Sequence, residues 1–166
     1  MRLRQGHQCN ASDLSSQIVM IDGYNVLTTI EVALAGGVLL LGRDGCLRDM
    51  ASMHGSFRRV SETVPALRLI GQTLAKIGVC DSTWLLDSPV SNSGRLKTTL
   101  EHTSTDHGWN WTVRLVANPD KMLIDSDQIV ATADSVILDH CHGWFNLARR
   151  VVGDYLPGVR VVDLSN

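Results

Sequence analysis

Residues 17–27 read QIVMIDGYNVL, an apolar and partly β-branched run that stops at Asp22 and Gly23. Such a run predicts a buried strand over 17–22 that ends at a functional edge of a sheet. Directly after it, apolar side chains recur at helical spacing, so a helix is expected over 25–35. Gly36 and Gly37 are expected to end this helix.

The rest of the chain repeats this alternation. Apolar runs predict strands over 82–86, 111–117, 129–134 and 159–164, and helical spacing predicts helices over 57–77, 95–107, 135–139 and 144–156. Asp44-Gly45, between apolar stretches at 38–41 and 46–50, predicts a hairpin, and Asn118-Pro119-Asp120 predicts a turn. Strands separated by helices are typical of a three-layer α/β/α sandwich with a mostly parallel, Rossmann-like central sheet. Residues 1–16 are polar and aperiodic, and we expect a tail ahead of one domain over 17–166.

Composition narrows the class of protein. The chain has 166 residues, 44% of them hydrophobic and 19% charged, which is typical of one globular domain. The longest apolar run, 36–42, is far shorter than the roughly 20 residues of a membrane-spanning helix, and the N-terminus has no apolar signal core. We therefore expect a cytoplasmic protein with no membrane partner, whose four cysteines, which lack CxxC spacing, are ordinary thiols. A net charge of −2 argues against tight, nonspecific binding of nucleic acid.

The acidic residues are unusual, because fourteen are Asp and only three are Glu. Three of the expected strands end in an aspartate, namely Asp22, Asp87 and Asp134. Parallel strands bring their carboxyl ends to one edge of a sheet, where ligands bind in open α/β folds. Carboxylates gathered there repel one another unless a cation neutralises them, so we expect Mg²⁺ or Mn²⁺ and phosphoryl chemistry. The alternative is that each aspartate only caps a helix.

Further candidates lie around these three. The loop SPVSNSG after Asp87 offers hydroxyl, amide and backbone N–H groups for a phosphate, and it is followed by basic residues; the candidates are Ser88, Ser91, Asn92, Ser93, Arg95 and Lys97. A solvated connection is the alternative for this loop. Among the remaining acids, Asp44 and Asp120 are the best additional metal ligands.

Three motifs carry a family resemblance: IDGYNVL at 21–27, LLDSPVSNSG at 85–94 and VATAD at 130–134. In this order, across about residues 17–165, they resemble the PIN/NYN-like nuclease superfamily. The resemblance implies that Asp22, Asp87 and Asp134 face one metal, that Asn25 supports the site, and that Thr132 lies within it. The motifs resemble most closely a mainly archaeal, uncharacterised PIN-like family, which implies a fold and a nuclease-like ancestry but no substrate.

The sequence departs from that pattern after the first motif, where the expected acid has no clear counterpart. Asp44, Asp49 and Glu31 are candidates for it, and Asp120, Asp125 and Asp127 are candidates for the acid before VATAD. Consecutive His140, Cys141 and His142 lack the usual zinc-ligand spacing, and no GxSxG, Walker or GxGxxG motif occurs.

We therefore expect metal-dependent phosphodiester hydrolysis, on RNA ahead of DNA. The alternative is a weakly active or inactive PIN-like domain that binds RNA or a protein. The 57–77 helix and the 38–50 hairpin are candidate faces for a homodimer.

Overall fold

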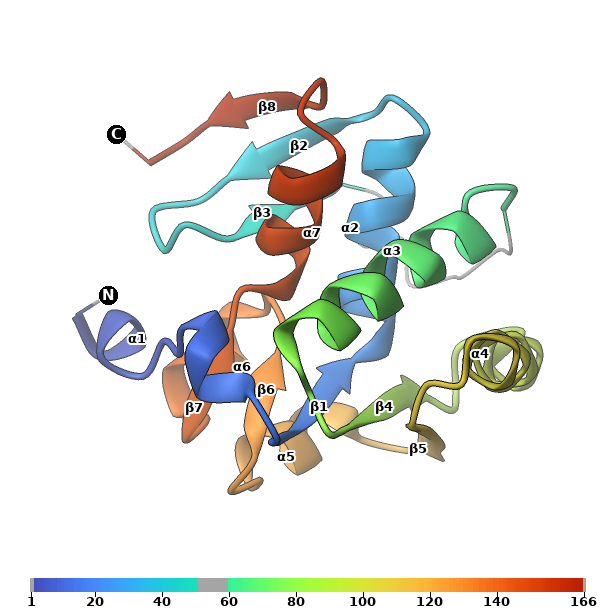
Figure 1. Ribbon diagram of the computed structural model, residues 1–166. Coiled ribbons are helices and arrows are strands. Elements are labelled where there is room, and N and C mark those ends of the chain that lie inside the picture. Colours follow the sequence, from blue (N-terminus) through green and yellow to red (C-terminus); the bar gives the residue numbers. More distant parts are fainter. Residues whose placement is uncertain (1, 51–59, 166) are drawn as a thin grey trace.

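The structure, a computed structural model, describes residues 2–50 and 60–165. Its central sheet has five strands, all parallel, in the order β5-β4-β1-β6-β7 (Figure 1). These strands are β1 (Ile18–Asp22), β4 (Asp81–Asp87), β5 (Trp111–Val116), β6 (Ile129–Ala131) and β7 (Gly143–Phe145). Helices cover both faces, so the predicted three-layer α/β fold is confirmed. Within the described ranges, no helix is long and apolar enough to cross a membrane.

The two faces of the sheet bury different side chains because residues along a strand alternate in direction. On β1, Val19 and Ile21 join the core under one helical layer, whereas Met20 joins the core under the other. The first layer contains α2 (Gly23–Leu34), α3 (Thr63–Ile77), α4 (Ser93–His107) and α7 (Leu147–Tyr155). The second contains α5 (Pro119–Ile124) and α6 (Ser135–His140), with α1 (Arg2–Gly6) packed beside α6.

A second sheet of three strands lies beyond α2 and α7 (Figure 1). It consists of β2 (Val38–Leu41), paired antiparallel with β3 (Leu47–Arg48) and parallel with β8 (Arg160–Asp163). The predicted Asp-Gly hairpin is therefore present, and Gly45 has the positive φ of 78° that its turn requires.

The N-terminal segment differs from the expected tail. It forms α1 and the 3₁₀ helix η1 (Ala11–Leu14), and Leu14 is fully buried. Gln8 bridges to Trp144, flanked by hydrogen bonds from the Cys9 N–H to the Trp144 carbonyl (2.7 Å) and from the Trp144 N–H to the His7 carbonyl (3.0 Å). This pairing uses backbone atoms along the edge of β7, so the polar side chains of the segment gave no indication of it in the sequence.

Other boundaries differ as well. The helix expected over 144–156 divides into the strand β7 and the shorter α7, because Trp144 and Phe145 are buried on opposite faces of the sheet. The turn expected at 118–120 is the start of α5, where the Asn118 side chain accepts a hydrogen bond from the Lys121 N–H. Pro65 lies in the first turn of α3, and the part of the predicted helix over 57–59 lies outside the described residues.

The chain order places a topological switch point at the centre of the sheet. From β1 the chain adds β4 and β5 on one side, then returns to add β6 and β7 on the other. The order of strands therefore reverses between β1 and β6, and ligands of doubly wound folds bind beside the carboxyl ends of strands at this point.

Candidate active site

Asp22 ends β1 and Asp134 follows β6, the two strands that flank the switch point, and Thr132 connects these aspartates. The Thr132 hydroxyl donates to Asp22 Oδ2 (2.7 Å), and its oxygen accepts a hydrogen bond from the Asp134 backbone N–H (3.0 Å). Thr132 is 4% exposed, so its hydroxyl serves this connection inside the fold. Asn25 holds the same segment from α2, because its Oδ1 accepts from the Ala133 N–H (2.8 Å).

The Asp22 carboxyl lies in an electrostatically unfavourable position. Burial, followed by the negative charges of Asp120 and Asp134, raises its pKa to about 7, and hydrogen bonding by Thr132 and the Asn25 backbone only partly offsets these effects. Asp22 precedes α2 but makes no side-chain cap hydrogen bond to it. The Asp22 carboxylate instead accepts a hydrogen bond from the Thr132 hydroxyl, so capping of α2 is not its main interaction.

Two further carboxyl groups, those of Asp120 and Asp87, lie near Asp22 and Asp134. Partial burial and the charges of Asp134 and Asp87 raise the pKa of Asp120, which lies in the first turn of α5. The structure thus brings together four carboxyl groups from four segments at one edge of the sheet. We call Asp22, Asp87, Asp120 and Asp134 the acidic cluster.

Asp134 has a second role, because its Oδ1 caps α6. It accepts hydrogen bonds from the backbone N–H groups of Val136 (2.8 Å) and Ile137 (3.2 Å). For this residue the capping alternative is therefore correct, while its charge also acts on Asp22 and Asp120.

The loop after Asp87 lies beside the cluster at the start of α4. Ser93 is buried and donates to the Ser88 carbonyl (3.3 Å), whereas Ser88, Ser91, Asn92 and Arg95 are exposed. The candidate Lys97 instead donates to the Val113 carbonyl (3.0 Å) and pairs with Glu101. Tyr24, at the start of α2, connects this loop to the cluster. Burial raises the pKa of its phenol to about 12, with a contribution from the Asp87 charge and an opposing one from the Ser93 hydroxyl.

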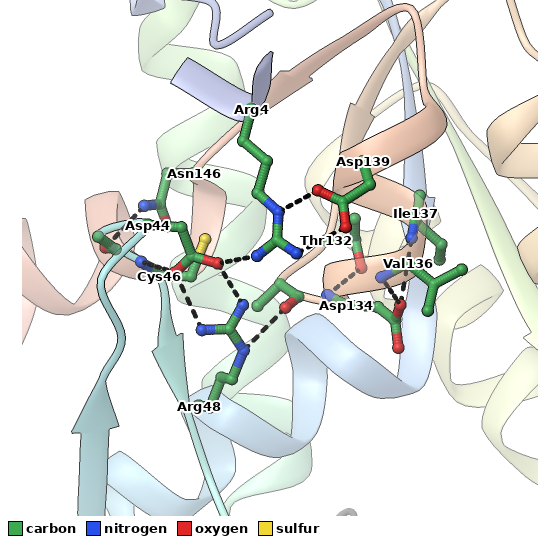
Figure 2. Close-up of polar contacts among 12 residues, drawn as sticks. Arg4, Asp44, Cys46, Arg48, Thr132, Asp134, Val136, Ile137, Asp139 and Asn146 are labelled. Carbon is green, nitrogen blue, oxygen red and sulfur yellow. Dashed lines mark hydrogen bonds and ion pairs between the residues drawn. The ribbon is translucent and has the colours of Figure 1, made fainter. Parts of the chain in front are cut away.

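Asp44 does not join the acidic cluster. It forms a two-point ion pair with Arg48, through Nη1 to Oδ1 (3.0 Å) and Nη2 to Oδ2 (2.7 Å), and also binds Arg4 (2.9 Å; Figure 2). Burial alone would raise the pKa of Asp44, but hydrogen bonds from Arg48 and the backbone, and the nearby guanidinium charges, lower it to about 2. Its charge is therefore already neutralised within the protein.

Arg48 and Arg4 are the residues that the sequence analysis missed. Arg48 Nε donates to the Ala133 carbonyl (2.9 Å), so this side chain ties the β2–β3 hairpin to the end of β6 (Figure 2). Arg4 reaches from α1 to both Asp44 and Asp139 on α6. For the Asp44–Arg48 pair, the signal in the sequence is the four-residue spacing across a predicted hairpin. No feature of the sequence indicates the contacts of Arg4.

The other acidic candidates lie elsewhere. Glu31 on α2 and Asp49, directly after β3, are buried and form a separate group, bound by the hydroxyls of Thr63 and Thr29, respectively. Burial, with the charges of Glu62 and Asp49, raises the pKa of Glu31 to about 7. Asp125 forms a surface ion pair with Lys121, and Asp127 is exposed. Of the three candidates before VATAD, the structure thus brings only Asp120 to the cluster.

Metal binding depends on how many ligands the protein must supply. Across residues 2–50 and 60–165, no three Asp, Glu, His or Cys side chains converge closely enough to hold a metal ion by themselves. Mg²⁺ is commonly held by only one or two carboxylates, with water and substrate phosphates completing its shell. The donor chemistry of the acidic cluster fits such a site, because the charged groups that act most strongly on Asp22 and Asp120 are all anionic.

The fold and this cluster define the class of protein: a doubly wound α/β domain with coupled carboxyl groups at its switch point. The chain belongs to the family described as domain of unknown function (DUF5616), which matches residues 11–150. It is 29% identical over 126 residues to the uncharacterized protein MJ0935 of Methanocaldococcus jannaschii, which covers 76% of this chain. The chain spans 60% of that relative's length. No solved structure matched it.

Proposed function

We propose that this protein is a metal-dependent phosphodiesterase of the PIN/NYN-like nuclease type, acting on RNA ahead of DNA. The observation that carries the proposal is the coupling of Asp22, Asp120 and Asp134 at the switch point, with a pKa of about 7 for Asp22. Strongly shifted carboxyl groups without a compensating cation are typical of functional sites. The resemblance of the three sequence motifs supplies the reaction class.

In this reaction each residue of the site would have a distinct role. Asp22 and Asp120 hold Mg²⁺ or Mn²⁺, which when bound supplies charge neutralisation and acidified water for attack on phosphorus. Asp134 contributes charge while its Oδ1 remains on α6. Thr132 and Asn25 fix the Asp22 carboxylate and the end of β6. The exposed groups of the 88–95 loop lie beside Asp87, where they can bind substrate phosphate.

The test compares the wild type with Asp22→Asn and with Asp127→Asn, a matched change at an exposed aspartate outside the cluster. End-labelled single-stranded RNA and DNA are incubated with each protein in Mn²⁺, Mg²⁺ or EDTA. We expect cleavage by the wild type and Asp127→Asn, and a loss on the order of 100-fold in Asp22→Asn, comparable to losing one main electrostatic contribution. Equal cleavage by all three proteins would identify a contaminant and contradict the proposal.

A second candidate function is an RNA-binding or protein-binding domain without hydrolysis. The use of Asp134 Oδ1 as a helix cap favours it, because this leaves fewer carboxylate oxygens for a metal. Manganese titration by calorimetry separates the two functions. The hydrolase predicts a binding heat that Asp22→Asn abolishes, whereas the binding domain predicts none.

A further inference from the structure

A polar cavity of about 480 Å³ lies outside the acidic cluster, between the N-terminal segment, the β2–β3 turn and one face of α7. We call it the α7 pocket. Gln5 and Gln8 line it from the N-terminal side, Arg43 and Asp44 from the turn, and Asn146, Arg149, Arg150, Gly153 and Asp154 from α7 and the residue before it. Its volume is in the range of small-molecule sites.

The pocket reaches the carboxyl edge of the central sheet, which carries the acidic cluster, at Asn146, the residue directly after β7. α7 follows the carboxyl end of β7, just as α2 and α6 follow the carboxyl ends of β1 and β6. Asp44 lines the pocket, Arg48 binds Asp44, and Arg48 also binds the Ala133 carbonyl next to Asp134 (Figure 2). A single arginine side chain thus spans from the pocket wall to the end of β6.

Positive charge predominates among the residues that line the pocket. Both acids that line it are already paired, Asp44 with Arg4 and Arg48, and Asp154 with Arg150 (2.8 Å). Arg149 is exposed and donates one hydrogen bond, from Nη1 to the Gly45 carbonyl (2.9 Å). A guanidinium has five N–H donors in a planar fork that suits phosphate, so one bond to a carbonyl orients Arg149 and leaves donors for a ligand.

We propose that the α7 pocket binds a phosphate-bearing nucleotide unit of a single RNA strand, next to the bond that the acidic cluster would cleave. Arg149 and Arg43 contact the phosphate, and the amides of Gln5, Gln8 and Asn146 surround the nucleotide. The identification of the strand rests on the proposed function, whereas the affinity of the pocket for phosphate does not. The acidic cluster repels a bare phosphate, so a basic pocket at the same edge retains the strand on the protein.

Gly153 allows a test that does not remove any charge. A Cβ at this position would meet nothing within 4 Å, so a side chain can be added here without disturbing the packing of α7, and a large one is expected to obstruct the wall of the pocket. Gly153→Phe and Arg149→Gln are compared with two changes outside the pocket: Gly158→Ala, at an exposed glycine where a Cβ would also meet nothing within 4 Å, and Arg68→Gln, which changes an exposed arginine on α3. All four are made in the Asp22→Asn protein, and binding of a labelled ten-nucleotide RNA is measured by fluorescence anisotropy in EDTA. Thermal unfolding verifies that each variant is folded.

We expect Arg149→Gln and Gly153→Phe to weaken RNA binding by about tenfold and the two controls to leave it unchanged. Arg149→Gln should also reduce the salt dependence of binding by about 0.7 in logarithmic slope, the value for one phosphate contact on a single strand. The proposal is overturned if all variants bind alike, if the parent protein does not bind RNA, or if adenosine monophosphate binds as tightly as the ten-nucleotide strand.

The outcome is separable from that of the proposed function. Binding that depends on Arg149, without any cleavage by the wild type in Mn²⁺, retains the pocket and rejects the hydrolase. Cleavage that depends on Asp22, with binding unaffected by Arg149→Gln and Gly153→Phe, retains the hydrolase and rejects the pocket.

Discussion

At the scale of single residues, the position of Asp22 is expected to make folding depend on pH. Its pKa is about 7 in the folded protein, against an ordinary value of 3.8, because burial and the charges of Asp120 and Asp134 disfavour the anion. Glu31, in the separate buried group, also has a pKa of about 7, against an ordinary 4.5. Each carboxyl therefore holds a proton more tightly in the folded state than in the unfolded state.

We predict that the free energy of unfolding in EDTA falls as the pH rises from 5 to about 7 and then levels off. In that window the folded protein binds more protons than the unfolded chain, so raising the pH favours unfolding. We expect a decrease of about 1 to 2 kcal/mol per group after allowance for solvent screening of partly exposed Asp22. Asp44 does not contribute to the pH dependence of the unfolding free energy in this window, because its pKa of about 2 places its titration at lower pH.

Urea unfolding at pH 5 and pH 8 provides the measurement, with Asp22→Asn and Asp127→Asn side by side. Asp22→Asn should reduce the dependence on pH by about half, because Glu31 still titrates in the same window, and Asp127→Asn should leave it as in the wild type. If Asp22→Asn retained the full slope, the assigned pKa of Asp22 would be incorrect.

At the scale of elements, two helical glycines have opposite surroundings. A Cβ on Gly71 in α3 would lie 2.0 Å from the Trp109 ring, whereas a Cβ on Gly153 in α7 would meet nothing within 4 Å. The Trp109 ring is held by stacking against His107, at 4.3 Å between centroids, and against Trp111, at 5.2 Å. Trp109 therefore covers α3 at the edge of the sheet that Trp111 begins.

We predict that Gly71→Ala destabilises the protein by about 1 to 3 kcal/mol, although alanine is the better helix former, because a fixed indole must move. Gly153→Ala should stabilise it by about 0.5 to 1 kcal/mol, the ordinary gain in helix propensity. Thermal and urea unfolding of both variants measure the difference. Stabilisation by Gly71→Ala would show that Trp109 does not pack on α3 as described.

The elements that the sequence predicted well are those whose residue pattern is compatible with only one type of secondary structure. The run from Ile18 to Asp22 is too short and too β-branched for a buried helix, and α4 and the β2–β3 hairpin have clear boundaries. β7 was missed because its buried Trp144 and Phe145 also fit the helical spacing that continues into α7. Only pairing with β6 makes these residues a strand, and that contact lies outside the local sequence.

The acidic cluster was partly predictable for the same reason. Strand ends are local features, so Asp22, Asp87 and Asp134 could be placed at one edge, whereas the sequence could not choose between Asp120, Asp125 and Asp127 as the acid before VATAD. The Asn118 cap settles that choice, because it starts α5 early enough to put Asp120 in its first turn. Asp44 looked equally suitable, but its pairing with Arg4 spans 40 residues and has no sequence signature.

At the scale of the whole molecule, the N-terminal segment connects parts of the fold that are distant in sequence. Arg4 joins the β2–β3 turn to α6 through Asp44 and Asp139, and its backbone carbonyl accepts a hydrogen bond from Trp144 Nε1 (2.7 Å). Gln8 adds a bridge along the edge of β7. Of these residues, Gln8 and Asp44 also line the α7 pocket, and the segment is packed as part of the folded domain.

We predict that deleting residues 1–9 destabilises the protein by about 2 to 4 kcal/mol. The deletion leaves the indole N–H of fully buried Trp144 without its acceptor and exposes the edge of β7, and an unsatisfied buried donor alone costs about 1 to 3 kcal/mol. Arg4→Gln is the matched control, because it removes the ion pairs but retains the backbone contacts, and Asp44 stays paired with Arg48. It should therefore cost less than half as much. Urea unfolding followed by tryptophan fluorescence measures both. A deletion no more harmful than Arg4→Gln would mean that the segment is held only by its ion pairs, and that the backbone pairing with β7 contributes nothing to the stability of the sheet.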